Sequence, residues 1–189
     1  MDLREEKRRL KDAIAERLSG LPEGKRAAES RSLCRRILDA LPPDAKTVCA
    51  FMPIGDEVDI RPLLTALLQR GVHLYLPCFE GGLVFRKATT LDGLAPGAFR
   101  IPEPAGEADA LDPALLDTAI VPGRAFNRKG HRLGRGNGGY DRWIRAQRIA
   151  NAATRFWGVC YECQLVAQVP MEAHDEPVDA VFTARGKES

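Results

Sequence analysis

Short apolar runs alternate with amphipathic segments along most of the chain, and this alternation constrains the fold more than any other feature of the sequence. The runs at 46–53 (KTVCAFMP) and 72–77 (VHLYLP) are bounded by turn residues and have the length of buried strands. Between them, residues 59–71 (DIRPLLTALLQRG) show helical periodicity and end at a glycine. A strand, a helix and a second strand in this order predict a βαβ unit with parallel strand pairing.

The rest of the chain extends this pattern on both sides. Two amphipathic helices separated by SGLPEG are predicted in the first forty residues, and a further helix at 138–150. Residues 94–116 are rich in proline and are expected to be mostly loop. Further strands are expected at 81–88 (hairpin-like), 117–123, 156–161 and 179–184. We therefore predict one α/β domain over residues 1–189, a three-layer, Rossmann-like sandwich whose largely parallel central sheet is covered by helices on both faces.

Composition places few further limits on function. Of 189 residues, 44% are hydrophobic and 29% are charged, which is typical of a soluble globular protein. No run approaches the roughly 18 apolar residues of a membrane span, and the N-terminal MDLREEKRRL does not resemble a signal peptide, so a cytoplasmic protein that does not act on membranes is expected. The net charge of +2 gives no long-range attraction for nucleic acid.

The five cysteines are an odd number without the spacing of a disulfide framework, which favours reduced thiols. Cys160 and Cys163 form a C-x-x-C pair. No second pair or nearby histidine completes a zinc site, so we interpret them as buried thiols.

The segment 130–143 (GHRLGRGNGGYDRW) is dense in glycine and arginine and follows the predicted strand at 117–123. In an open parallel sheet, ligands bind at the carboxyl ends of the strands. Glycines there expose backbone N–H groups, a helix N-terminus attracts anions, and arginine binds phosphate oxygens in bidentate fashion. The segment matches neither common nucleotide-binding motif. Phosphate binding is the favoured interpretation, and a flexible surface loop is the alternative.

Charged residues elsewhere have two interpretations each. Asp141 is the single acid between Arg124 and Arg148, among seven arginines and one lysine, and either pairs with them or binds Mg²⁺ beside a polyphosphate. Asp175 is either a turn residue or a second ligand of that metal. Lys7 and Lys11 lie four residues apart, on one face of the first predicted helix, which is either a solvated basic face or part of a site.

These pieces together resemble the 5-formyltetrahydrofolate cyclo-ligase (5,10-methenyltetrahydrofolate synthetase) family. The stretch VPGRAFNRKGHRLGRGNGGYDRW is similar to the family signature, approximately vPGvaFDxxGxRLGxGxGYYDR. The segments KRRLKDAIAERLSGLPEGKR, FMPIGDEVDIRPLL, RIPEPAG and YECQLVAQVPMEAHDEPVDAVFT resemble other parts of the family in the same order. The resemblance covers nearly the whole chain.

The resemblance implies an ATP- and Mg²⁺-dependent enzyme. Members convert 5-formyltetrahydrofolate to 5,10-methenyltetrahydrofolate and release ADP and phosphate. The implied partner is therefore a small folate, and neither nucleic acid nor a membrane. We also expect a monomer. The resemblance also implies the site residues. Those for ATP are Lys7, Lys11, Arg132, Leu133, Gly134, Arg135, Gly136, Asn137, Gly138, Gly139 and Tyr140, with Arg132, Arg135 and Tyr140 catalytic. Those for the folate are Met52, Glu57, Arg135, Gly136, Asn137, Gly138 and Gly139. Asp141 and Asp175 match the magnesium carboxylates.

The chain departs from the family pattern at a few positions. Gly139 stands where the family has the first tyrosine of YYD, Asn127 replaces an aspartate, and Lys11 replaces an arginine, which loses the bidentate fork. Asn137 occupies a glycine or lysine position, and EVDI lacks a threonine. These departures leave two alternatives open: a related ATP-dependent enzyme for another small molecule, and a non-catalytic module that binds ATP or nucleic acid.

Overall fold

The computed structural model describes residues 2–97 and 101–188 and is built on a central sheet of seven strands in the order β11-β10-β9-β6-β1-β2-β3. The strands are β1 (Thr47–Cys49), β2 (His73–Phe79), β3 (Leu83–Ala88), β6 (Thr118–Val121), β9 (Arg155–Val159), β10 (Ala180–Thr183) and β11 (Gly186–Glu188). Neighbours from β10 to β2 run parallel, whereas β3 and β11 are antiparallel edge strands. The predicted βαβ unit is confirmed, because β1 and β2 pair in parallel around the helix between them.

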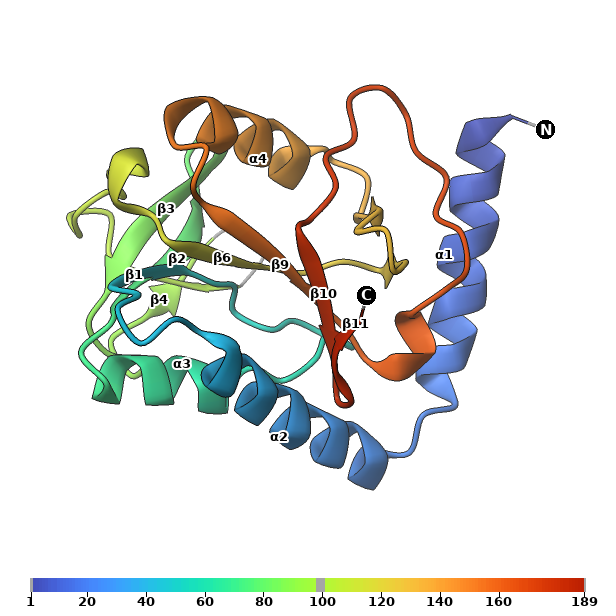
Figure 1. Cartoon of the computed structure of the whole chain (residues 1–189), viewed down its shortest axis with the longest axis horizontal. Helices are drawn as coiled ribbons and strands as arrows, with labels where there is room; N and C mark the ends of the chain where they lie inside the picture. Colours follow the sequence, from blue (N-terminus) through green and yellow to red (C-terminus); the bar gives the residue numbers. More distant parts are fainter. Residues whose placement is uncertain (1, 98–100, 189) are drawn as a thin grey trace.

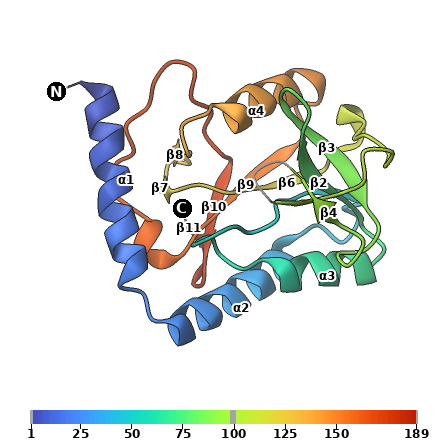
Figure 2. The same cartoon turned by 180° about the vertical axis from the view of Figure 1, so that it is seen from behind.

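Helices cover both faces of the sheet, as predicted. Helices α2 (Glu23–Ala40) and α3 (Arg61–Gln69) lie on one face and α4 (Gly139–Ala150) lies on the other (Figures 1 and 2). Two apolar clusters reflect these layers. One joins Leu33 and Leu67 to the sheet, and the other packs Ile144 of α4 against Phe126 and Phe156. Both clusters consist of side chains that the helical and strand periodicities direct inward.

Helix α1 (Leu3–Ser19) does not belong to either layer. It stands to one side of the sheet (Figures 1 and 2), and contacts the short helix η3 (Glu162–Gln164) and strand β7 (Ala125–Phe126). Ile14 and Leu18 are fully buried there. The side chain of Asp2 accepts the N–H of Arg4, which caps the helix. Helix α1 therefore presents its polar face toward the end of the sheet where the strands terminate.

Several expected boundaries need correction. The strand expected at 46–53 pairs only over β1, and β11 was not predicted, because Gly186–Glu188 has no apolar pattern. The proline-rich stretch 94–116 contains the two-residue strands β4 (Ala95–Pro96) and β5 (Pro102–Glu103) and the 3₁₀ helix η2 (Pro113–Leu115), with 98–100 outside the described residues. Within the described ranges, no helix is both long and apolar enough to cross a bilayer.

Candidate active site

A cleft of about 1200 Å³ opens at the carboxyl ends of the parallel strands. Its walls come from α1, from the segment after β1, from the ends of β2 and β3, from the glycine-rich segment before α4, and from the loop before β10. Every residue that the sequence predicted for the site lines this cleft: Lys7, Lys11, Met52, Glu57, all of Arg132–Asp141, and Asp175. The topology therefore brings together residues that lie more than 160 positions apart in the sequence.

The glycine-arginine segment begins with a small hairpin instead of the simple loop that was expected. Strands β7 (Ala125–Phe126) and β8 (Arg132–Leu133) pair antiparallel. The side chain of Asn127, which replaces the family's aspartate, accepts the backbone N–H groups of Lys129 and His131, both at 3.0 Å. Gly130 has φ +80°, and a Cβ there would lie 2.0 Å from a backbone oxygen, so only glycine fits this turn. An amide oxygen can therefore accept both hydrogen bonds of this turn without the charge of a carboxylate.

The hairpin leads into the N-terminus of α4 through glycines with left-handed backbone. Gly136 has φ +114° and Gly138 has φ +65°. The side chain of Asn137 accepts the N–H of Gly139 at 3.2 Å, so this amide already bonds an oxygen in the structure. Phosphate binding here would exchange that side-chain oxygen for a phosphate oxygen.

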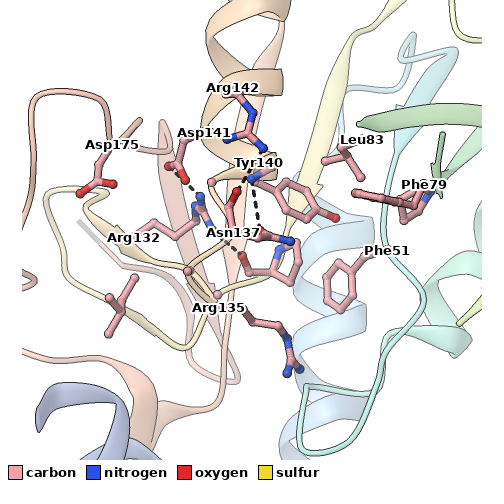
Figure 3. Close-up of a pocket in the computed structure, with 18 of the residues that line it drawn as sticks. Phe51, Phe79, Leu83, Arg132, Arg135, Asn137, Tyr140, Asp141, Arg142 and Asp175 are labelled. Atoms are coloured by element: carbon pink, nitrogen blue, oxygen red, sulfur yellow. Dashed lines mark hydrogen bonds and ion pairs between the residues drawn. The ribbon is translucent and has the colours of Figure 1, made fainter. Parts of the chain in front are cut away.

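Arg132 and Asp141 form the most deeply buried ion pair of the cleft (Figure 3). Arg132 Nη2 lies 2.8 Å from Asp141 Oδ1, and the side chains are 2% and 12% exposed. Asp141 Oδ1 also accepts the backbone N–H of Glu176 at 3.2 Å. Arg132 Nε has no hydrogen-bond partner within the described residues. The guanidinium of Arg132 is therefore directed at Asp141, with little of its surface open to a ligand.

Lys7 of α1 is bound by two carboxylates from the loop before β10. Its Nζ lies 2.5 Å from Asp175 Oδ2 and 2.7 Å from Glu172 Oε2. Burial alone would lower the pKa of Lys7, but the two hydrogen bonds together have the larger effect, so the pKa is raised. Burial would raise the pKa of Asp175, but the bonds from Lys7 and from the Glu172 N–H lower it. Asp175 is thus held as a carboxylate.

Oxygen donors suitable for a hard cation lie on this loop. The ligand atoms of Glu172, His174 and Asp175 lie within 4.8 Å of one another. Asp141 is not part of this group among the described residues. Asp175 and Asp141 nevertheless both face the cleft (Figure 3). Carboxylates of this kind fit Mg²⁺. The sequence analysis missed Glu172 and His174, although the polar run EAHDEP that contains them was visible.

Glu57 lies on the opposite side of the cleft and contacts the glycine-rich segment directly. Its Oε1 accepts from Arg135 Nη2 at 2.9 Å, and its Oε2 accepts the N–H of Ile54 at 3.1 Å. Arg135 is 47% exposed, in contrast to Arg132, and its carbonyl accepts from Lys11 Nζ at 3.2 Å. Met52 is partly buried against the apolar core and lines the same wall.

Tyr140 is set at the inner wall by aromatic packing. Its ring meets Phe85 and Trp143 edge to face, with centroids 6.5 and 6.2 Å away, and the Arg132 guanidinium lies 5.7 Å from its centroid. Burial raises the pKa of Tyr140 far above its ordinary value, so at neutral pH its hydroxyl is protonated. A side chain at the neighbouring Gly139 would begin in ordinary van der Waals contact with Asn137. A Cβ would meet its nearest atom, Asn137 Oδ1, at 3.5 Å.

The basic patch from Arg124 to Arg148 is largely neutralised by acids from other parts of the chain. Carboxylate partners lie within 3.2 Å of six of its seven arginines: Arg124 with Asp56, Arg128 with Glu188, Arg132 with Asp141, Arg135 with Glu57, Arg145 with Glu176, and Arg148 with Glu176 and Asp179. Arg142 donates to the Asn137 carbonyl. Most of the excess positive charge seen in the sequence is therefore paired with carboxylates in the structure.

The two cysteines of the C-x-x-C pair do not form a disulfide. Cys160 is buried, and burial raises the pKa of its thiol strongly; Cys163 is partly buried, and its pKa is raised by the same cause. Both shifts oppose thiolate formation. The interpretation as buried thiols is confirmed for Cys160, whereas Cys163 is only partly buried.

The structure combines an α/β sheet that has a cleft at its carboxyl ends, a glycine-rich segment that enters a helix, and carboxylates paired with lysine and arginine. This combination is typical of proteins that bind phosphate-containing ligands. Comparisons with known proteins identify the family. The profile of the 5-formyltetrahydrofolate cyclo-ligase family matches residues 3–184, and the chain belongs to this family.

Individual relatives agree with this assignment. The chain is 35% identical to the 5-formyltetrahydrofolate cyclo-ligase of Escherichia coli K12, over 74% of this chain and 78% of the relative. It is 31% identical to that of Mycolicibacterium smegmatis, over 95% and 94%. The solution structure of Aquifex aeolicus 5,10-methenyltetrahydrofolate synthetase superposes with a TM-score of 0.82 at 32% identity, covering 96% of this chain and 91% of that one.

Proposed function

We propose that the chain is an ATP-dependent cyclo-ligase that converts 5-formyltetrahydrofolate to 5,10-methenyltetrahydrofolate. In this reaction the formyl oxygen takes the γ-phosphoryl group of ATP and ADP leaves. N10 then attacks the activated formyl carbon and loses its proton, and the carbon–oxygen bond breaks to release phosphate. The formyl oxygen is a poor leaving group until it is phosphorylated, which is why ATP is required.

One observation supports this proposal above the others: Arg135 spans the two halves of the cleft. It belongs to the glycine-rich segment predicted to bind ATP, and its guanidinium bonds Glu57, which is predicted to bind the folate. Both substrates would therefore meet around one cation. Phosphoryl transfer is catalysed mainly by positioning and by neutralising charge, and an exposed arginine between the two sites can do both.

The remaining predicted residues divide into two groups by exposure. Lys11, Arg135 and the α4 N-terminus are accessible and would contact the phosphates, whereas Arg132 is nearly inaccessible and would act by holding Asp141. Tyr140 would serve as a neutral hydrogen-bond donor, because its raised pKa rules out a role as a base at neutral pH. Asp141 and Asp175 would hold Mg²⁺, which would supply positive charge to neutralise the phosphates of ATP.

The test follows the appearance of methenyl absorbance with purified protein, 5-formyltetrahydrofolate, ATP and Mg²⁺. We expect a rise that requires ATP and is reduced at least about a hundredfold in Arg135→Met, the typical loss for a residue that stabilises transition-state charge. The matched control is Arg9→Met, since Arg9 is a 63%-exposed arginine of α1 that pairs with Glu5 outside the cleft. A flat trace from the wild-type chain with ATP binding intact would favour an enzyme for another small molecule.

The charge distribution argues against the nucleic-acid alternative. Non-specific nucleic-acid binding depends on unpaired cations, and the arginines of the patch are mostly paired within the chain. Oligonucleotide binding with a steep salt dependence would contradict this argument. A monomeric state and a cytoplasmic location stay predictions; size-exclusion chromatography with light scattering tests the first.

A further inference from the structure

Two consecutive acids, Asp56 and Glu57, each pair with an arginine of the segment 122–139. Asp56 Oδ1 lies 2.6 Å from Arg124 Nη1, and Glu57 Oε1 lies 2.9 Å from Arg135 Nη2. The two pairs differ in exposure. The arginine side chain is 17% exposed in the first pair and 47% exposed in the second, whereas the acids are 30% and 10% exposed. The loop that carries Glu57 is thus joined to segment 122–139 through one sheltered arginine, Arg124, and one accessible arginine, Arg135. These are the sheltered pair and the accessible pair.

The sheltered pair is anchored on a fixed backbone. The N–H of Arg124 donates to the Leu133 carbonyl at 2.7 Å, and its carbonyl accepts from Gln164 Nε2 at 3.0 Å. Gln164 is itself 2% exposed. On the other side, the carbonyl of Glu57 accepts the Tyr161 hydroxyl at 3.4 Å. Arg124 is therefore a rigid attachment point for the loop from Ile54 to Asp59.

The accessible pair must open if the proposed function is correct, and this inference rests on that function. Arg135 has to release Glu57 so that Arg135 can contact phosphate and Glu57 can bond the folate ring. After Arg135 has released Glu57, the ion pair of Asp56 and Arg124 is the one that still joins loop 54–59 to segment 122–139 within the described residues. Without it, Glu57 would keep its bonds to the Ile54 N–H and the Tyr161 hydroxyl, but the loop would lose its ion pair to segment 122–139. Glu57 would then be less firmly placed before the folate binds, and ordering it on binding weakens affinity.

We propose that Asp56 and Arg124 are positioning residues that hold Glu57 in place for the folate after Arg135 has left it. Arg124 stands where the family signature quoted above has an apolar residue, so this arrangement belongs to this chain's own sequence. Neither side chain of the pair acts on the reacting atoms. Their effect is on the affinity of the folate half of the cleft.

The kinetic test compares Asp56→Asn, Arg124→Gln and the double variant. We expect the KM for 5-formyltetrahydrofolate to rise about fivefold in each single variant, which corresponds to ~1 kcal/mol, the upper end for a partly exposed ion pair. The double variant should be no worse than either single one, because the pair acts as a unit. The KM for Mg-ATP and kcat should change less than about twofold.

The matched control is Asp59→Asn. Asp59 lies on the same loop and pairs with Arg61 at 2.7 Å, but this pair is exposed and neither residue lines the cleft. The control should leave both KM values unchanged. A parallel rise of both KM values in Asp56→Asn, or additive effects in the double variant, would overturn the proposal, since these are the signs of general loosening or of independent roles.

Hydrogen exchange separates failure of this inference from failure of the proposed function, because it needs no substrate. The amides of 54–58 should exchange faster in Asp56→Asn and Arg124→Gln than in the wild-type chain, with no such change in Asp59→Asn. If the wild-type chain does not turn over the folate but this exchange difference is present, the cyclo-ligase function fails, and only the attachment of loop 54–59 by the Asp56–Arg124 pair stands. Unchanged exchange in 54–58 would refute this attachment whatever the activity.

Discussion

The buried pair of Arg132 and Asp141 predicts a large stability loss from a substitution made to test function. Asp141→Ala removes the carboxylate 2.8 Å from Arg132 Nη2 and leaves a guanidinium whose side chain is 2% exposed. The hydrogen bond from Nη1 to the Pro122 carbonyl is long, at 3.5 Å, and Nε lacks a partner within the described residues. The remaining contacts therefore compensate the charge poorly.

Breaking a buried ion pair from one side costs about 3–5 kcal/mol. Because Asp141 is 12% exposed, water can enter the space that its carboxylate vacates, and we expect the lower end, ~3 kcal/mol. In a chain of 189 residues this corresponds to a fall in Tm of about 6–12 °C. Asp141→Asn should cost less, since an amide oxygen can still accept from Arg132.

Removing both charges reverses the argument. Arg132→Met combined with Asp141→Ala leaves no buried charge, so the double variant should be more stable than Asp141→Ala alone. Urea denaturation and thermal unfolding measure this, with Asp12→Ala as the control, because Asp12 is 70% exposed and 3.8 Å from Arg8. The reasoning is refuted if Asp141→Ala melts within about 2 °C of the wild type, or if the double variant is the less stable one.

Three further predictions concern single positions. Gly130→Ala should lose at least ~2 kcal/mol, since φ is +80° and the new Cβ would lie 2.0 Å from a carbonyl oxygen; a melting curve like the wild type's would contradict this. Lys7→Met should lower Tm at neutral pH, because it removes a partner that holds the pKa of Asp175 below its ordinary value of 3.8. The stability from this lowered pKa is present above pH 3.8 and is lost as the pH falls through the folded value, so the difference in Tm should shrink as the pH is lowered below 3.8; a difference that does not depend on pH counts against the pairing. Gly139→Tyr should fold normally, because its Cβ meets nothing closer than 3.5 Å, and should lower the KM for the folate; an unchanged KM would show that the ring is not used.

The periodicity of the sequence was sufficient to predict the layers of the fold. The βαβ order determined the parallel pairing of β1 and β2, and the apolar runs gave the central strands. Periodicity could not find β7, β8 or β11. Strands of two or three residues are too short to show a period, and they form through hydrogen bonds to the adjacent strand.

The contacts within the site were the part that the sequence could not give. The positions lining the cleft followed from the glycine-arginine pattern and the family resemblance, but their partners did not. Glu57 lies 78 positions from Arg135, and Asp175 lies 168 from Lys7. In the sequence, Asp141 is the single acid among seven arginines. In the structure, Glu176 and Asp179 of another loop pair with two of these arginines. Whether two charges that lie far apart in the sequence form a pair depends on how the fold brings them together.

The pairing of Lys7 with Asp175 leads to a last prediction, that ATP binds with its metal and poorly without it. Lys7 is bonded to two carboxylates, so a phosphate that takes its ammonium leaves Asp175 and Glu172 unpaired in a half-buried place. If a divalent cation arrives with the phosphates, those carboxylates gain a positive partner as Lys7 leaves, and no charge is left uncompensated. We therefore expect titration calorimetry to give at least about tenfold weaker binding for ATP with chelator than for Mg-ATP, a difference of ~1.4 kcal/mol. Glu172→Gln removes one of the two carboxylates that compete for Lys7, and it should reduce the difference in affinity between Mg-ATP and ATP with chelator. Equal affinity with and without Mg²⁺ would mean that the phosphates do not displace Lys7 from its carboxylates.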